Sequence, residues 1–155
     1  MKQYLLDSFL FNDTANKKML SKIKSLPNKE HCIKYFSHLI NSQYKWMARI
    51  LQNPKAAGMS WWEPVYHLGE LEVEWDKSLA PWIDYINSKT ENELEEDVIF
   101  TGFDGSLWAA TPKDIALQIN YHSIHHRAQM QTIIRGQNIE PDFIDYIGTK
   151  YRKLP

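Results

Sequence analysis

Hydrophobic positions along the chain recur at helical spacing in four segments. The first segment covers about residues 2–25 and ends before Pro27, which cannot continue a helix. The second covers about residues 28–51 and starts at Asn28, a residue favoured as an N-cap. In both segments the apolar residues fall three or four positions apart. This spacing predicts amphipathic helices that pack one face into a core.

The third helical segment covers about residues 64–87 and contains Pro81. An internal proline removes a backbone hydrogen bond and clashes with the preceding turn, so we expect a kink or a break near Ala80. The fourth segment has the clearest boundaries. Thr111 is suited to cap its start, and Gly136 is suited to end it.

Between the third and fourth segments, residues 98–108 carry a different signal. Asp104-Gly105 stands between two apolar runs, which is typical of a β-hairpin. A hairpin among four long helices leaves the fold class all-α. We therefore expect one domain over residues 1–155, a four-helix bundle with a small β-hairpin inserted before the last bundle helix. The tail, residues 138–155, is apolar enough that we expect it to pack across the bundle.

Composition narrows the class of protein. The 155 residues are 43% apolar and 24% charged with a net charge of -1, which is ordinary for a soluble globular protein and argues against a nucleic-acid partner. The chain shows no signal peptide and no apolar run long enough to span a membrane, so we expect a cytoplasmic protein with no membrane partner. The single cysteine, Cys32, allows no internal disulfide, and we interpret it as a buried thiol rather than a nucleophile.

The candidate chemistry lies in the last predicted helix. His122 and His126 are four positions apart on its apolar face, so two imidazoles can point to one place inside the bundle. Neutral imidazole is a good ligand for several divalent transition metals. From the spacing alone, a metal site and a pair of hydrogen-bonded core histidines both remain open. His125 lies off this line, and we interpret it as a packing or hydrogen-bonding residue.

A metal site needs at least one more ligand, and the remaining candidates are His31, His38 and His67. His38 shares a helix face with polar residues, namely Ser42, Lys45 and Arg49. That face is either solvated or lines a polar cavity, and periodicity does not decide between the two. Composition does not favour His38 over His31 either.

Several stretches resemble the DinB-like family, four-helix bundles that include bacterial DNA-damage-inducible proteins and thiol S-transferases. Phe11-Asn-Asp-Thr-Ala-Asn16 is similar to the family's first-helix signature, and residues 37–49 are similar to its second helix. Residues 122–129 resemble its His-x-x-His-His-Arg-Gly-Gln signature, with Ala128 in place of the usual glycine. The segment from Gly136 onward is similar to its closing segment.

The resemblance implies that one divalent metal ion is held by His38, His122 and His126. Three protein ligands leave coordination positions open, as in catalytic zinc sites. The resemblance thus implies a metal-dependent enzyme, either a thiol S-transferase that uses a low-molecular-weight thiol with a small-molecule substrate, or a hydrolase. Zinc or nickel is the expected ion, with iron or manganese as alternatives. The alternative function is a non-catalytic metal-binding or stress-response module. In either case we expect a homodimer.

Other side chains have two interpretations each, and no catalytic residue is assigned. Arg127 and Gln129 either support the ligand histidines or tie helices together. Arg127 and Lys45 are candidates to orient a substrate. A group of tryptophans either walls a pocket or belongs to the core or an interface: Trp46, Trp61, Trp62 and Trp108.

Overall fold

The computed structural model describes residues 1–102 and 104–154. Phe103, in the predicted hairpin, and Pro155, at the end of the predicted domain, lie outside the described residues. The α-helices are α1 (Lys2–Lys24), α2 (Glu30–Ile50), α3 (Leu71–Ser88) and α4 (Pro112–Arg135). The strands are β1 (Val98–Thr101) and β2 (Leu107–Ala110). Short 3-10 helices are η1 (Ala56–Gly58), η2 (Glu93–Glu95) and η3 (Tyr146–Thr149).

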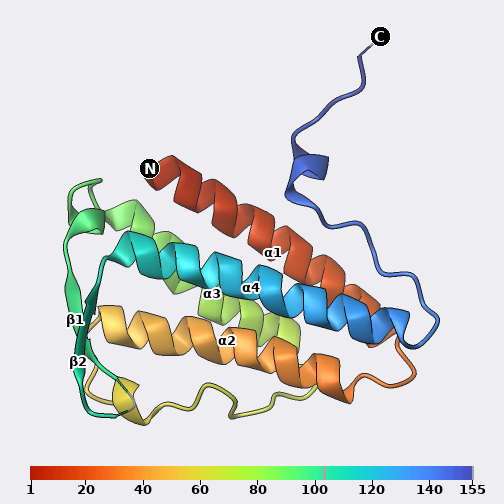
Figure 1. Cartoon of the computed structure of the whole chain (residues 1–155), viewed down its shortest axis with the longest axis horizontal. Helices are drawn as coiled ribbons and strands as arrows, with labels where there is room; N and C mark the ends of the chain where they lie inside the picture. Colours follow the sequence, from red (N-terminus) through yellow and green to blue (C-terminus); the bar gives the residue numbers. More distant parts are fainter. Residues whose placement is uncertain (103, 155) are drawn as a thin grey trace.

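The four helices form a bundle in which α1 and α2 lie diagonally opposite each other (Figure 1). Each of these two helices packs against both α3 and α4. The antiparallel pair β1-β2 closes one end of the bundle and directly precedes α4. The prediction of an all-α bundle with a hairpin insertion is confirmed. No helix in the described part of the chain is long and apolar enough to cross a membrane.

Large aromatic side chains fill the core at both ends of the bundle. Phe36 and Trp75 meet near the α1-α2 turn, with ring centres 5.6 Å apart, and Phe9 stacks on Trp82 at the same separation. All four side chains are fully buried. Burial of one such side chain stabilises the fold by about 1.5–3 kcal/mol.

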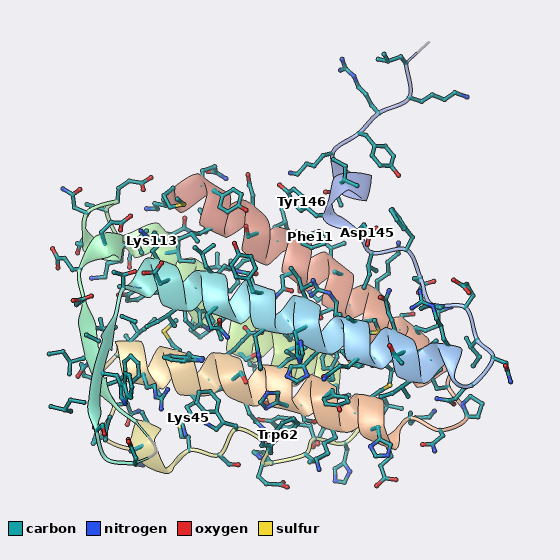
Figure 2. The ribbon with its side chains drawn as sticks, in the orientation of Figure 1. Phe11, Lys45, Trp62, Lys113, Asp145 and Tyr146 are labelled. Carbon is teal, nitrogen blue, oxygen red and sulfur yellow. The ribbon has the colours of Figure 1, made fainter. Side chains whose placement is uncertain are left out.

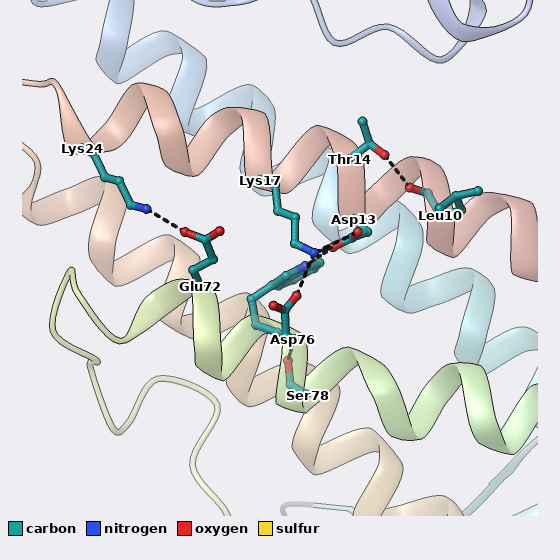
Figure 3. A network of polar contacts seen from close by, with 9 residues as sticks. Leu10, Asp13, Thr14, Lys17, Lys24, Glu72, Asp76 and Ser78 are labelled. Atoms are coloured by element: carbon teal, nitrogen blue, oxygen red, sulfur yellow. Dashed lines mark hydrogen bonds and ion pairs between the residues drawn. The ribbon is translucent and has the colours of Figure 1, made fainter.

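Polar contacts join α1 to α3 on the outside of the bundle (Figure 3). Lys17 pairs with Asp13 at 3.1 Å and with Asp76 at 2.8 Å, and Lys24 pairs with Glu72 at 2.7 Å. Exposed pairs of this kind contribute little to stability. The indole N–H of Trp75, by contrast, donates to the Asp13 carboxylate at 2.8 Å, so this large core side chain has its polar atom satisfied.

The helix α2 begins two residues later than predicted. Its N-cap is Lys29, whose side chain makes no capping hydrogen bond. Asn28 is instead held by Gln137 after α4: its backbone N–H donates to the Gln137 side chain, and its carbonyl accepts from the same amide. The prediction that Asn28 is the N-cap is wrong because this tertiary contact fixes the residue outside the helix.

The helix α3 begins at Leu71, so the predicted start near Pro64 is also wrong. Residues ahead of it run extended along α2, because the Asn41 amide donates to the Pro64 carbonyl at 3.0 Å and the Ser37 hydroxyl accepts from the Tyr66 N–H at 3.1 Å. The expected break near Ala80 is absent, since α3 continues through the exposed Pro81 to Ser88.

The boundaries of α4 agree with the sequence. The Thr111 hydroxyl accepts from the Asp114 N–H and donates to the Asp114 carboxylate, and the helix ends at Arg135 before Gly136. The hairpin pairs Val98 with Ala110 and Thr101 with Leu107. Gly105 has a φ of 82°, a value that favours glycine and explains its place in this turn.

The tail follows the prediction only in part. Ile139 and Ile144 pack against the core and the Tyr146 ring contacts that of Phe11 on α1, but the chain beyond it leaves the bundle, as Figure 1 shows. Several large apolar side chains of the tail are exposed, namely Phe143, Tyr146, Ile147, Tyr151 and Leu154. The expectation that the whole tail packs across the bundle is therefore wrong.

Cys32 provides a test of this fold. Its side chain is 0% exposed, and burial raises the pKa of the thiol to about 11. About one thiol in a thousand is ionised at pH 8 under these conditions. We expect the native protein to resist a colorimetric disulfide reagent at pH 8, while the protein in guanidinium releases one equivalent of chromophore. Fast reaction of the native thiol would contradict the packing described for α2.

Candidate metal centre

Three histidines from two helices meet between α2 and α4. His38 comes from α2, and His122 and His126 come from consecutive turns of α4. One ring nitrogen from each lies within 4.8 Å of the other two, and the Nε2 atoms of His38 and His122 are 2.8 Å apart. The other candidate third ligands, His31 and His67, are exposed and lie outside this cluster.

His38 is brought inside by the loop between α2 and α3. This segment, residues 51–70, runs along the outer side of α2 and is called the covering loop here (Figure 1). Under it, His38 is 5% exposed, and its polar neighbours on the helix are buried too: Ser42, Lys45 and Arg49. Of the two interpretations of this face, the structure therefore shows the buried one.

The covering loop also orients the His38 ring. The Nδ1–H donates to the Trp61 carbonyl oxygen at 2.6 Å, and the Trp62 ring stacks on the imidazole with centres 3.8 Å apart. Only a protonated Nδ1 can donate to a carbonyl oxygen, so Nε2 of the neutral ring keeps its lone pair. That lone pair belongs to the nitrogen that faces His122.

His126 is held in the same manner from its own helix. Its Nδ1 donates to the Gln129 side-chain oxygen at 2.6 Å, which leaves the Nε2 lone pair free. Tyr35 of α2 stacks on the ring with centres 5.2 Å apart. A partner on the second ring nitrogen is the usual way in which proteins fix a metal-binding imidazole.

Burial keeps these imidazoles neutral at physiological pH. It lowers the pKa of His122 and His126 to about 4, and the charges of neighbouring histidines add to that effect. Burial also lowers the pKa of His38, against the opposing effect of its bond to Trp61. Since a metal ion binds only the unprotonated nitrogen, the protein need not release a proton from these rings near pH 7.

The donor set fits a divalent transition metal. Two nitrogens held by one zinc ion, each at about 2.0–2.1 Å, are about 3.3 Å apart in tetrahedral geometry. The observed separations, from 2.8 Å for His38 and His122 to at most 4.8 Å, bracket that value. At 2.8 Å the His122 Nε2–H donates to His38 Nε2, so metal binding would require this proton to move to Nδ1 of His122. The cluster is thus compatible with metal binding.

The remaining predicted residues fall into separate roles. Arg127 points away from the histidines and donates to Asn16 of α1 and to Ser123, so it ties helices together and does not orient a substrate at this site. Gln129 supports His126, one of the three candidate ligands. His125 is exposed, in accord with its placement off the line of the other two.

Lys45 binds the covering loop. Its ammonium donates to the Met59 carbonyl and lies 4.5 Å from the centre of the Trp61 ring, next to the carbonyl that holds His38 (Figure 2). Sequence reasoning missed the Trp61 carbonyl and the stacking role of Trp62. No helical periodicity marks an irregular loop, and a backbone oxygen carries no residue-specific signal. In the sequence, only the adjacent tryptophans Trp61 and Trp62 indicated that this loop contributes to a site.

The fold and this site define a four-helix-bundle protein with a three-histidine cluster between its second and last bundle helices. The sequence matches the profile of the DinB superfamily over residues 21–130. This match covers more than half of the chain, and the protein belongs to the DinB superfamily. A search of curated proteins found no match.

The cluster predicts a defined metal stoichiometry. Protein purified without an affinity tag and loaded with zinc should hold about one equivalent. Replacing His38, His122 or His126 singly by Ala should lower the bound metal severalfold after dialysis, because two ligands hold an ion poorly. His125→Ala is the matched control, one residue from His126 yet exposed, and should retain full occupancy. Elemental analysis measures both, and equal metal contents would refute the assignment.

Gln129 should affect affinity without changing stoichiometry. Gln129→Ala removes the acceptor of the His126 Nδ1–H, and loss of such a partner lowers metal affinity by about 10–100-fold. Gln131→Ala is the control, because Gln131 sits on the same helix but donates to the Asp142 carbonyl. Competition with a chromogenic chelator gives both affinities, and identical values would show that the His126-Gln129 contact does not support a ligand.

Proposed function

We propose that this protein binds one divalent metal ion through His38, His122 and His126 and uses it as a metal-dependent enzyme. The observation that carries the proposal is the convergence of three neutral imidazoles, two of which have their Nδ1 atoms held by hydrogen bonds. Buried histidines need hydrogen-bond partners in any case, but here both partners bind Nδ1 and leave the Nε2 lone pairs of His38 and His126 within one cluster. Zinc or nickel is the proposed ion, with iron or manganese as alternatives, because three imidazoles suit several of these ions.

A divalent ion in this position supplies a Lewis acid that lowers the pKa of a coordinated thiol or water. The protein contributes fixed ligands and a surrounding wall. Trp62 stacks on His38 and is 40% exposed, and His122 is half-buried, so the cluster lies at the edge of the bundle where a small molecule can reach it. Lys34 lies 5.8 Å from the Trp62 ring centre and favours an anionic substrate.

Transfer of a low-molecular-weight thiol to a small electrophile is the favoured reaction, with hydrolysis as the second. The three-histidine donor set supports both, since it leaves coordination positions for either nucleophile. Membership of the DinB superfamily adds support for the first, because the family that the sequence resembles includes thiol S-transferases. The protein is proposed to act as a cytoplasmic homodimer, for which the exposed apolar side chains of the tail supply one candidate contact.

Turnover tests this function. Zinc- or nickel-loaded protein is incubated with a chloro-dinitrobenzene electrophile and a panel of cellular thiols, and separately with ester and amide substrates. We expect metal-dependent product in one panel. His122→Ala should reduce the rate at least 100-fold, because the ion no longer activates the nucleophile.

His125→Ala is the control and should keep the rate of the unchanged protein. Product formed equally by His122→Ala or by chelator-treated protein would rule out metal-dependent catalysis. Stoichiometric metal with no product in any panel would instead favour a non-catalytic metal-binding or stress-response module.

A further inference from the structure

A cavity lies on the opposite side of α4 from the histidines. It has a volume of about 210 Å³ and sits on the seam between α1 and α4. Its walls include aromatic rings from both helices and from the tail, namely Tyr4, Phe11, Tyr121 and Tyr146. Figure 2 shows Phe11 and Tyr146 close together where the tail passes α1, and their rings meet edge to face at 5.1 Å. A cavity of about 150 Å³ is sufficient for a benzene ring.

The cavity is lined by a buried positive charge. Arg127 is 3% exposed, and among the described residues no carboxylate lies within ion-pairing distance of its guanidinium. Its hydrogen bonds all leave from one nitrogen, Nη1, to Asn12, Asn16 and Ser123. In the same part of the chain no acceptor is found for Nε or Nη2, and the guanidinium carbon lies 5.6 Å from the centre of the Phe11 ring. A buried charge without a counter-ion is costly, and an anion beside it would remove that cost.

Two buried amides that line this cavity each have one polar atom without a partner in the described chain. Asn12 is 1% exposed and its Nδ2 donates to no acceptor, while Asn120 is 6% exposed and its Oδ1 accepts from no donor. Both side chains line the same cavity. Native proteins leave few buried polar atoms unsatisfied. Two unsatisfied amide atoms and a guanidinium with two nitrogens free of protein acceptors therefore surround one hollow, and they indicate a place where a polar ligand completes the hydrogen bonding.

We propose that this cavity binds a small carboxylate-bearing molecule with an aromatic or other flat apolar body. The free edge of the Arg127 guanidinium, Nε–H and Nη2–H, has the geometry to donate two parallel hydrogen bonds to a carboxylate. Asn12 is the neighbouring donor, and the rings of Phe11 and Tyr121 receive the apolar body. The site shares no lining residue with the histidine cluster, so its occupancy does not require a metal ion.

A purely structural role for Arg127 explains only part of these observations. The contacts of Nη1 with Asn16 and Ser123 join α1 to α4, and a neutral side chain could provide them without a buried charge. Such a role leaves unexplained why the other nitrogens lack acceptors beside an aromatic-walled hollow. The anion site accounts for the charge, the unpaired amides and the cavity together.

The test uses two probes of the same shape, 4-fluorobenzoate and 4-fluorobenzyl alcohol, titrated into zinc-loaded, nitrogen-15-labelled protein. Amide shifts should map to α1 and α4 around Asn12, Asn120 and Tyr121, with the carboxylate binding at least tenfold more tightly than the alcohol. Equal affinities, or shifts confined to other elements, would overturn the proposal. Arg127→Met should abolish the preference for the carboxylate.

Because Arg127→Met can also disturb folding, a second variant tests the site from its rim. Tyr121→Glu places a negative charge at the mouth and should weaken fluorobenzoate binding at least tenfold. Tyr151→Glu, at a similarly exposed tyrosine of the tail, should leave it unchanged. In His38→Ala the fluorobenzoate affinity should persist. Loss of binding there would place the anion at the metal instead and would refute this second site, whatever the outcome for the metal-dependent activity.

Discussion

The packing of α2 against α4 is the contact on which the rest of this structure depends. It brings His38 opposite the His122-His126 pair, although 84 residues separate His38 and His122 in sequence. Two imidazoles on one helix already share a face, but a third must come from a neighbouring helix at a matched height. The register between these two helices therefore decides whether there is a cluster at all. The apolar contacts along the bundle fix this register.

The covering loop buries and orients the histidine that this packing brings to α4. It buries a polar face of α2 that would otherwise be solvated, and its backbone carbonyls satisfy the side chains it covers. The Trp61 carbonyl receives His38, and the Met59 carbonyl receives Lys45. Arg49 completes the arrangement, with its guanidinium 4.7 Å from the Trp46 ring centre and 5.1 Å from that of Trp61. Cations here hold the covering loop in place, and the loop in turn holds His38.

Positive charge is also buried on the other side of α4, but different groups contact it there. Lys45 and Arg49 contact carbonyl oxygens and aromatic faces, with Nε of Arg49 left without an acceptor in the described chain. Arg127 contacts amide and hydroxyl oxygens through one of its nitrogens and lies 5.6 Å from the Phe11 ring centre, next to a hollow. The consecutive residues His126 and Arg127 of α4 thus lie on different faces of the helix, toward α2 and toward α1. A single short motif contributes both to the candidate metal centre and to the proposed anion site.

The sequence by itself determined the helical class, the boundaries of α4, the hairpin and the His122-His126 pair, because each depends on spacing or capping within one segment. It could not choose His38 over His31, nor place the start of α3, nor foresee the exposed end of the tail. The resemblance to the DinB-like family named His38, but only tertiary structure shows why that histidine is buried. The deciding groups are the Trp61 carbonyl, the Trp62 ring, and the Tyr66 N–H and Pro64 carbonyl that hydrogen-bond to Ser37 and Asn41 of α2. These come from a loop folded back on a helix, and no local pattern of residues records such a contact.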